Sequence, residues 1–136
     1  MASYTKIDSF VECLAEKLID LSGNGLTIAL TNTAHTSTWD ELADLTQVSY
    51  TNLSTRVITV GTSSQTAGTY KLVLTDLTLT STGGTTGPFR YVYIYDDNST
   101  NDKLIGYYDY GSSITMQSGD QFVVNFDGSS GALTIA

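Results

Sequence analysis

Short runs in which apolar and polar residues alternate fill most of the chain, and turn-forming residues separate them about every ten positions. A strand with this period buries one face, so repeated runs favour antiparallel sheets packed face to face. We therefore predict a mainly β fold, an antiparallel β-sandwich or jelly-roll-like single domain spanning residues 1–136. The predicted strands, between about 26 and 135, are Leu26–Thr31, Thr55–Val60, Thr69–Ser81, Phe89–Tyr95, Leu104–Tyr110, Gln121–Phe126 and Leu133–Ile135.

One of these runs changes phase along its length. Apolar residues alternate from Tyr70 to Leu74 and then resume one residue out of step at Leu77. A slip of one residue is typical of a β-bulge or a sharp bend, which we expect near Thr75-Asp76.

One amphipathic helix is predicted near the N-terminus, from about Ser9 to Leu21. Its apolar stripe contains Phe10, Leu14, Leu18 and Leu21, and charged residues occupy the other side. Ser9 and Glu12 have the spacing of a capping box, and Gly23 supplies a left-handed stop. We expect the stripe to cover an open end of the sheets. A shorter turn is predicted at Trp39–Leu45.

The charge balance limits the partners of the chain. Its 136 residues include 6 Lys and Arg against 14 Asp and Glu, which gives a formal net charge of −8. Such a surface repels phosphate backbones and anionic lipids, so we expect neither nucleic acid nor a membrane as partner. No secretory signal follows Met1, and no apolar run approaches the roughly 18 residues of a membrane span. We expect the chain to be made in the cytoplasm.

The sequence offers little catalytic chemistry. His35 is the single histidine, and no Gly-x-Ser-x-Gly motif accompanies it, so we interpret it as a plain loop residue. Cys13 is the single cysteine, which excludes an intramolecular disulfide and a cysteine-based zinc site and indicates an inert thiol in the helix. The acidic residues of Trp39–Leu45 indicate a solvated turn. We predict no enzyme activity, no catalytic residues and no cofactor.

One polar loop has the oxygen spacing of a cation-binding loop. Asp96–Asp102 places side-chain oxygens at alternate positions, as in the first half of a calcium loop. The glycine and the closing glutamate of that motif are missing. We therefore predict an exposed hairpin loop and no metal site.

The most distinctive feature is a concentration of tyrosines on two neighbouring strands. Phe89, Tyr91, Tyr93 and Tyr95 alternate on one predicted strand, and Tyr107, Tyr108 and Tyr110 follow on its expected hairpin partner. Tyrosine combines a large apolar ring with a polar tip, so such a row suits a protein interface or a sugar platform. It suits a core equally well. The candidate interface residues are Tyr91, Tyr93, Tyr95, Tyr107, Tyr108 and Tyr110.

Several stretches resemble small structural proteins of tailed bacteriophages. They are Leu30–Thr33, Gln47–Tyr50, the segment from Gly87-Pro88 to Val92, and Leu104–Gly111. Within that group the chain is most similar to capsid decoration (cement) proteins. The resemblance implies a β-sandwich or jelly-roll protein on the outside of the virion capsid, bridging neighbouring subunits of the major capsid protein. We also expect a homo-oligomer of the chain on the particle, and the resemblance identifies no binding residues.

Two functions from different classes follow. The first is a virion structural protein that clamps the capsid surface. The alternative is a receptor- or carbohydrate-binding module of a phage tail or head fibre, which ordered, solvent-facing tyrosines around a groove would favour.

Overall fold

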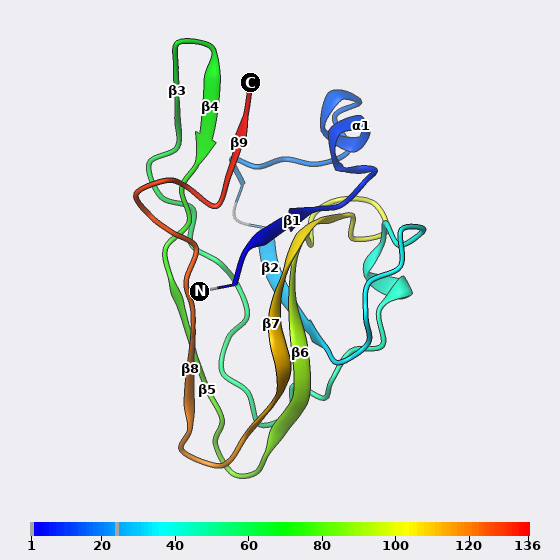
Figure 1. Cartoon of the computed structure of the whole chain (residues 1–136), viewed down its shortest axis with the longest axis vertical. Helices are drawn as coiled ribbons and strands as arrows, with labels where there is room; N and C mark the ends of the chain where they lie inside the picture. The colour runs from blue at the N-terminus through cyan, green and yellow to red at the C-terminus, as the bar shows by residue number, and fades with distance from the viewer. Residues whose placement is uncertain (1, 24) are drawn as a thin grey trace.

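The computed structural model describes residues 2–23 and 25–136 and confirms the mainly β, antiparallel fold with one short α-helix. The elements in chain order are β1 (Tyr4–Lys6), α1 (Phe10–Ala15), β2 (Leu26–Thr31), the 3-10 helix η1 (Leu42–Asp44), β3 (Ser64–Thr66), β4 (Thr69–Leu72), β5 (Leu77–Thr80), β6 (Thr86–Asp96), β7 (Leu104–Met116), β8 (Gln121–Val124) and β9 (Leu133–Ile135). Figure 1 shows the long β6–β7 hairpin in the middle of the molecule.

The first layer is a four-stranded antiparallel sheet with the order β1-β7-β6-β2. Its two inner strands form the hairpin that the sequence predicts, with Tyr93 opposite Tyr107. β2 pairs with β6 along its whole length, from Leu26 opposite Asp96 to Thr31 opposite Tyr91. The three residues of β1 pair with β7 at the other edge.

The second layer consists of the three-stranded sheet β3-β4-β9 and the two-stranded sheet β5-β8. β4 and β5 belong to one predicted strand, and residues 73–76 interrupt it where the phase change in the sequence predicted a break. The jelly-roll order stays a prediction, because this layer is divided between two small sheets.

One irregular segment joins the two layers along one side. Ile58 donates its backbone N–H to Leu26 of β2, and Gly61 donates to Val73 beside β4. The predicted strand at 55–60 therefore forms isolated bridges in place of a regular strand, through Val57 to Thr27 and through Val60 to Leu74. Each strand is thus hydrogen-bonded to the next in one series, which runs from β1 through the first layer and this irregular segment to β9.

Both faces of the first layer are covered, and all six residues from Tyr91 to Asp96 are buried. On the inner face Phe89, Tyr110 and Tyr108 contact the aromatic rings of β8 and of Phe126. On the outer face the segment 32–58 packs over the sheet, seen as the cyan and teal coil beside β6 in Figure 1. A strand buried on both faces has no polar alternate positions, which explains the nearly continuous apolar run.

A bulge in the hairpin changes which side its residues face. Tyr91 lies opposite Asp109, whereas Phe89 lies opposite Ile114, so the register shifts between them. Arg90 and Tyr91 both lie opposite Asp109, because a bulge places two residues of one strand opposite one residue of its partner. Phe89 therefore contacts Phe122 on the inner face, and the prediction that it shares a face with the tyrosines is wrong.

The predicted helix at Ser9–Leu21 is wrong in length, because α1 ends at Ala15. Lys17 adopts a left-handed conformation with φ of 64°, and Leu18 donates its N–H to the Cys13 carbonyl. With the bond from Lys17 to Leu14 this forms a Schellman stop, six residues before Gly23 where we expected one. Beyond this stop Ile19 and Leu21 are buried, whereas Leu18 is 42% exposed.

The capping box of α1 is also absent, whereas one exists at η1. Ser9 makes no side-chain cap, and its hydroxyl oxygen is buried without a hydrogen-bond partner among the described residues. At η1 the Glu41 and Asp44 side chains cap each other's backbone. Cys13 is buried, as expected for an inert thiol.

The bulged part of the hairpin gives a test of the fold. Gly87 has φ of +117°, and a Cβ there would lie 2.6 Å from the Ile114 carbonyl oxygen. Gly111 has φ of +83°, and a Cβ there would meet nothing within 4 Å. We expect Gly111→Ala to cost about 1–2 kcal/mol through backbone strain alone. Gly87→Ala should cost at least about 1 kcal/mol more, because overpacking adds to strain. Urea denaturation measures both values, and equal costs would contradict the close approach at Gly87.

Candidate binding site

The six tyrosines that the sequence predicts as interface residues divide between two sides of the first layer. Tyr93 and Tyr107 contact each other on the outer face, with ring centroids 5.1 Å apart, and Tyr91 and Tyr95 alternate with them on the same side. Tyr108 and Tyr110 face the second layer. Tyr91, Tyr93, Tyr95 and Tyr108 are buried, whereas Tyr107 and Tyr110 are half-buried.

The six rings therefore do not form one exposed contact face. The reason is physical: β6 is an inner strand, and the segment 32–58 covers the side of it that would otherwise face water. The alternative that the tyrosines belong to the core holds for the four buried rings. Of the six, Tyr107 and Tyr110 are partly exposed.

His35 lies in a loop, as predicted, and its side chain also links the covering segment to the tyrosines. Its Nδ1 lies 2.9 Å from the Tyr93 hydroxyl oxygen, and its ring stacks on Tyr107 at 4.7 Å. Trp39 meets the His35 ring edge-on. Burial lowers the pKa of His35, and Asp8 has a smaller, opposite effect. Burial also raises the pKa of the Tyr93 hydroxyl.

A second anchor lies further along the same face. Arg56 donates a hydrogen bond of 2.6 Å to the Ile28 carbonyl and one of 3.4 Å to the Tyr95 hydroxyl. Its guanidinium lies 3.8 Å from the centre of the Tyr50 ring. The Tyr50 hydroxyl in turn accepts the Leu30 N–H. These contacts give buried polar groups their partners and leave no tyrosine platform for a sugar at this point.

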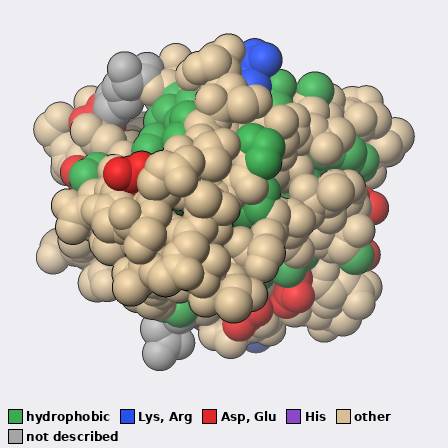
Figure 2. Space-filling view, turned by 90° about the horizontal axis from the view of Figure 1, so that it is seen from below, with side chains coloured by type: hydrophobic (Ala, Val, Ile, Leu, Met, Phe, Trp, Pro, Cys, Tyr) green, Lys and Arg blue, Asp and Glu red, His purple; other side chains and the backbone are tan. Residues whose placement is uncertain are grey.

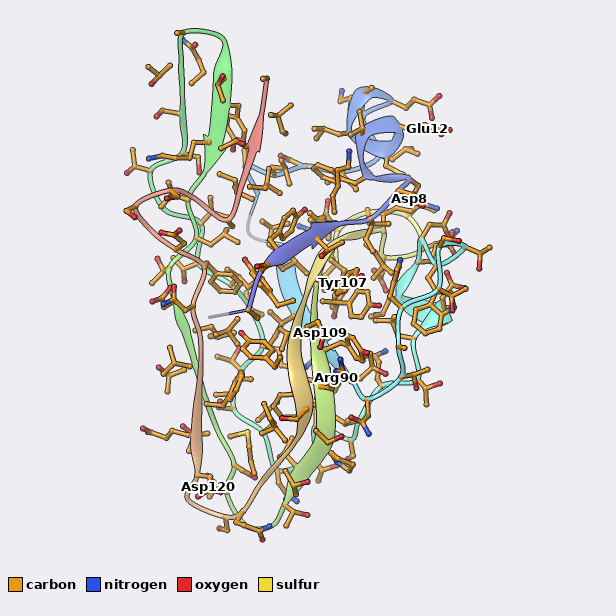
Figure 3. The ribbon with its side chains drawn as sticks, viewed as in Figure 1. Asp8, Glu12, Arg90, Tyr107, Asp109 and Asp120 are labelled. Carbon is orange, nitrogen blue, oxygen red and sulfur yellow. The ribbon has the colours of Figure 1, made fainter. Side chains whose placement is uncertain are left out.

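The exposed part of this face has a charged pair. Arg90 donates two hydrogen bonds to Asp109, of 2.7 and 3.0 Å, and Figure 3 shows the two side chains together with Tyr107 further along β7. The bonds from Arg90 lower the pKa of Asp109. An exposed pair of this kind contributes little to stability.

The polar loop after β6 is a hairpin loop, as predicted. Asp96 is buried and accepts the backbone N–H groups of Asp20 and Asn98, at 2.9 and 3.0 Å. Burial and the neighbouring Asp97 raise the pKa of Asp102. No group of three or more metal-ligating side chains occurs within residues 2–23 and 25–136.

Three pockets lie between β1 and the chain from residue 125 to residue 136. One pocket of about 250 Å³ is lined by Tyr4, Lys6, Phe10, Val11 and residues 133–136. A second of about 460 Å³ continues along residues 130–134, and a third of about 250 Å³ lies between Tyr4, Tyr108 and Asp127. All three share Tyr4. Because the linings of neighbouring pockets overlap, we call the three together the β1–β9 groove.

The walls of the β1–β9 groove are strand edges. β1 pairs with β7 on one side only, and β9 pairs with β4 on one side only, among the residues that the structure describes. The Tyr4 ring lies across Gly106, where a Cβ would clash with it, and its hydroxyl donates to the Ile105 carbonyl. The two ends of the series of hydrogen-bonded strands, β1 and β9, are therefore not paired with each other. Sequence analysis missed this site because a three-residue strand gives no periodic signal.

The end of the molecule at the bottom of Figure 1 presents a different surface. In Figure 2 hydrophobic side chains appear there only in small separate areas among polar side chains and backbone. Scattered apolar groups of this kind need no functional explanation.

Comparison of the chain with protein-family models, with curated proteins and with solved structures found no match. None of the helices in the described part of the chain has the length and apolar character to cross a membrane.

The position of the tyrosines can be tested by truncation. We expect Tyr93→Ala to lower the free energy of unfolding by about 3–5 kcal/mol, because it empties a buried site. Tyr107→Ala should cost clearly less, because its ring is half-exposed. Urea unfolding followed by circular dichroism measures both, and a smaller cost at Tyr93 would contradict the core position.

The lowered pKa of His35 predicts a pH dependence. An unfolded histidine titrates at a pKa near 6.5, so the unfolded chain binds this proton at a higher pH than the folded chain does. Stability should therefore fall as the pH decreases below about 6.5 until the folded His35 also titrates. Urea midpoints between about pH 7.5 and 5 should fall more in the wild type than in His35→Gln, whose side chain does not titrate. Parallel curves for the two proteins would contradict the burial effect.

Proposed function

We propose that this chain is a virion structural protein that binds the outside of a phage capsid and clamps neighbouring subunits of the major capsid protein. It would be made in the host cytoplasm and then assemble on the capsid surface in many copies. Weak contacts that repeat over a shell add up to firm attachment, so no single copy needs a large interface.

The observation that supports this proposal best is the β1–β9 groove. Unpaired strand edges offer another protein backbone hydrogen bonds, and the apolar floor between them offers area to bury. Elsewhere, buried residues of both layers form one hydrophobic core. The similarity of sequence stretches to phage structural proteins points to the same class of partner.

The acidic composition is consistent with this role. A formal net charge of −8 keeps free copies apart before assembly, because like-charged surfaces repel each other. On the same grounds we propose neither nucleic acid nor a membrane as a partner.

Occupancy on purified particles tests the proposal. The ratio of this chain to the major capsid protein, measured by quantitative mass spectrometry, should be fixed and close to stoichiometric. Particles stripped of the chain should release their genome at a lower temperature, and adding the purified chain back should restore the original temperature. A few copies at the tail or on a fibre, with no effect on rupture, would favour the receptor- or carbohydrate-binding alternative.

A further inference from the structure

We infer that the β1–β9 groove binds an extended segment of the capsid partner as an added strand on the edge of β1, with an acidic residue of that segment beside Lys6. This inference rests on the proposed function, because it names the chemistry of the part of the partner that binds.

The backbone of β1 determines which groups are free for an added strand. Ile7 donates its N–H to the Ile105 carbonyl at 3.1 Å. In an antiparallel pair every second residue makes such bonds, so Thr5 and Ile7 both direct their backbone N–H and C=O groups toward β7. The alternate residues Tyr4 and Lys6 then turn their N–H and C=O groups away from β7. No strand among the described residues pairs with that edge. These groups can pair with an extended segment and with few other ligands.

The groove also has an apolar floor that an added strand would cover. Phe10 and Leu133 are buried at its base, and Val11 is 51% exposed at its rim. Ile135 is half-buried on the β9 side. Side chains of a strand point alternately to opposite faces, so every second residue of the occupant would lie on this floor. We therefore expect the occupant to have apolar residues at alternate positions.

The charge at the edge of β1, away from Asp127 in the third pocket, favours an acidic neighbour for Lys6. Lys6 is the only charged side chain that lines the two pockets beside β9, and its side chain is exposed. The two ion pairs found among the described residues join Arg90 to Asp109 and Lys103 to Glu41, so neither uses it. A cation at a strand edge also opposes pairing with a second copy of the same edge. Mutual repulsion between two chains of net charge −8 acts in the same direction.

Blocked heptapeptides of alternating Thr and Val, with Glu or Lys at the central position, serve as probes. Titration followed by backbone NMR should shift amide signals of β1 and β9 and give an affinity for each probe. The Glu probe should bind the wild type about two- to fivefold more tightly than the Lys probe, as expected for one cross-strand charge pair. Lys6→Glu should reverse that order.

Lys17→Glu is the matched control, because it changes the net charge equally at an exposed position outside the groove linings. It should keep the wild-type order of the two probes. An unchanged order in Lys6→Glu, or shifts that fall outside β1 and β9, would overturn the inference. If Lys6→Glu does not fold, Lys6→Gln replaces it and should abolish the preference.

Particle binding separates this inference from the proposed function. If Lys6→Glu occupies capsids as well as the wild type does, the proposed function stands and the groove is not its contact. If the probes behave as expected but wild-type chain does not bind capsids, the groove binds an acidic strand of another protein. A wild-type dimer in sedimentation that dissociates in Lys6→Glu would place a second copy in the groove and overturn the inference.

Discussion

The burial of β6 on both faces is the constraint on which the rest of the structure depends. The hydrogen bonds of an inner strand lie in the plane of the sheet and cover neither of its faces. Other elements must therefore pack on each face of β6 to bury its side chains. The second layer covers one face, where the Phe122 ring contacts Phe89 of β6. The segment 32–58 covers the other, although it contains little regular structure. Leu45 and Ile58 of this segment are buried in the core, and the rest of it lies over the sheet.

This covering segment is held by polar contacts that replace a sheet ladder. Its links to the sheet include the His35–Tyr93 contact, the two hydrogen bonds of Arg56, and the bond from the Thr31 hydroxyl to the Thr46 carbonyl at 2.6 Å. Each contact gives a partner to a group that would otherwise be buried without one, which costs about 1–3 kcal/mol per group. The hydroxyls of Tyr93 and Tyr95 thus have a structural role, which explains why tyrosine rather than phenylalanine occupies these two positions of β6.

Period-two alternation in the sequence was enough to predict the fold class, and β2 and β9 match their predicted ranges residue for residue. The same pattern could not place the bulge at Arg90, because a bulge depends on the partner strand. The helix was overestimated because its stop is a Lys17 in a conformation usually taken by glycine.

The tyrosines were ambiguous because an aromatic row looks alike in a core and on a surface. The continuous apolar run of β6 was the available signal for burial on both faces. The β1–β9 groove has no local signal, since distant segments form it.

The two ends of the described chain, Ala2 and Ala136, line two pockets of the groove that share Tyr4. This placement has a practical consequence for fusions and for surface display. Cargo or an affinity tag attached at either terminus would lie over the unpaired strand edges and compete with whatever binds there. The exposed turn between β7 and β8, with Asp120 at the far end of the molecule in Figure 3, can accept an insertion without approaching the groove.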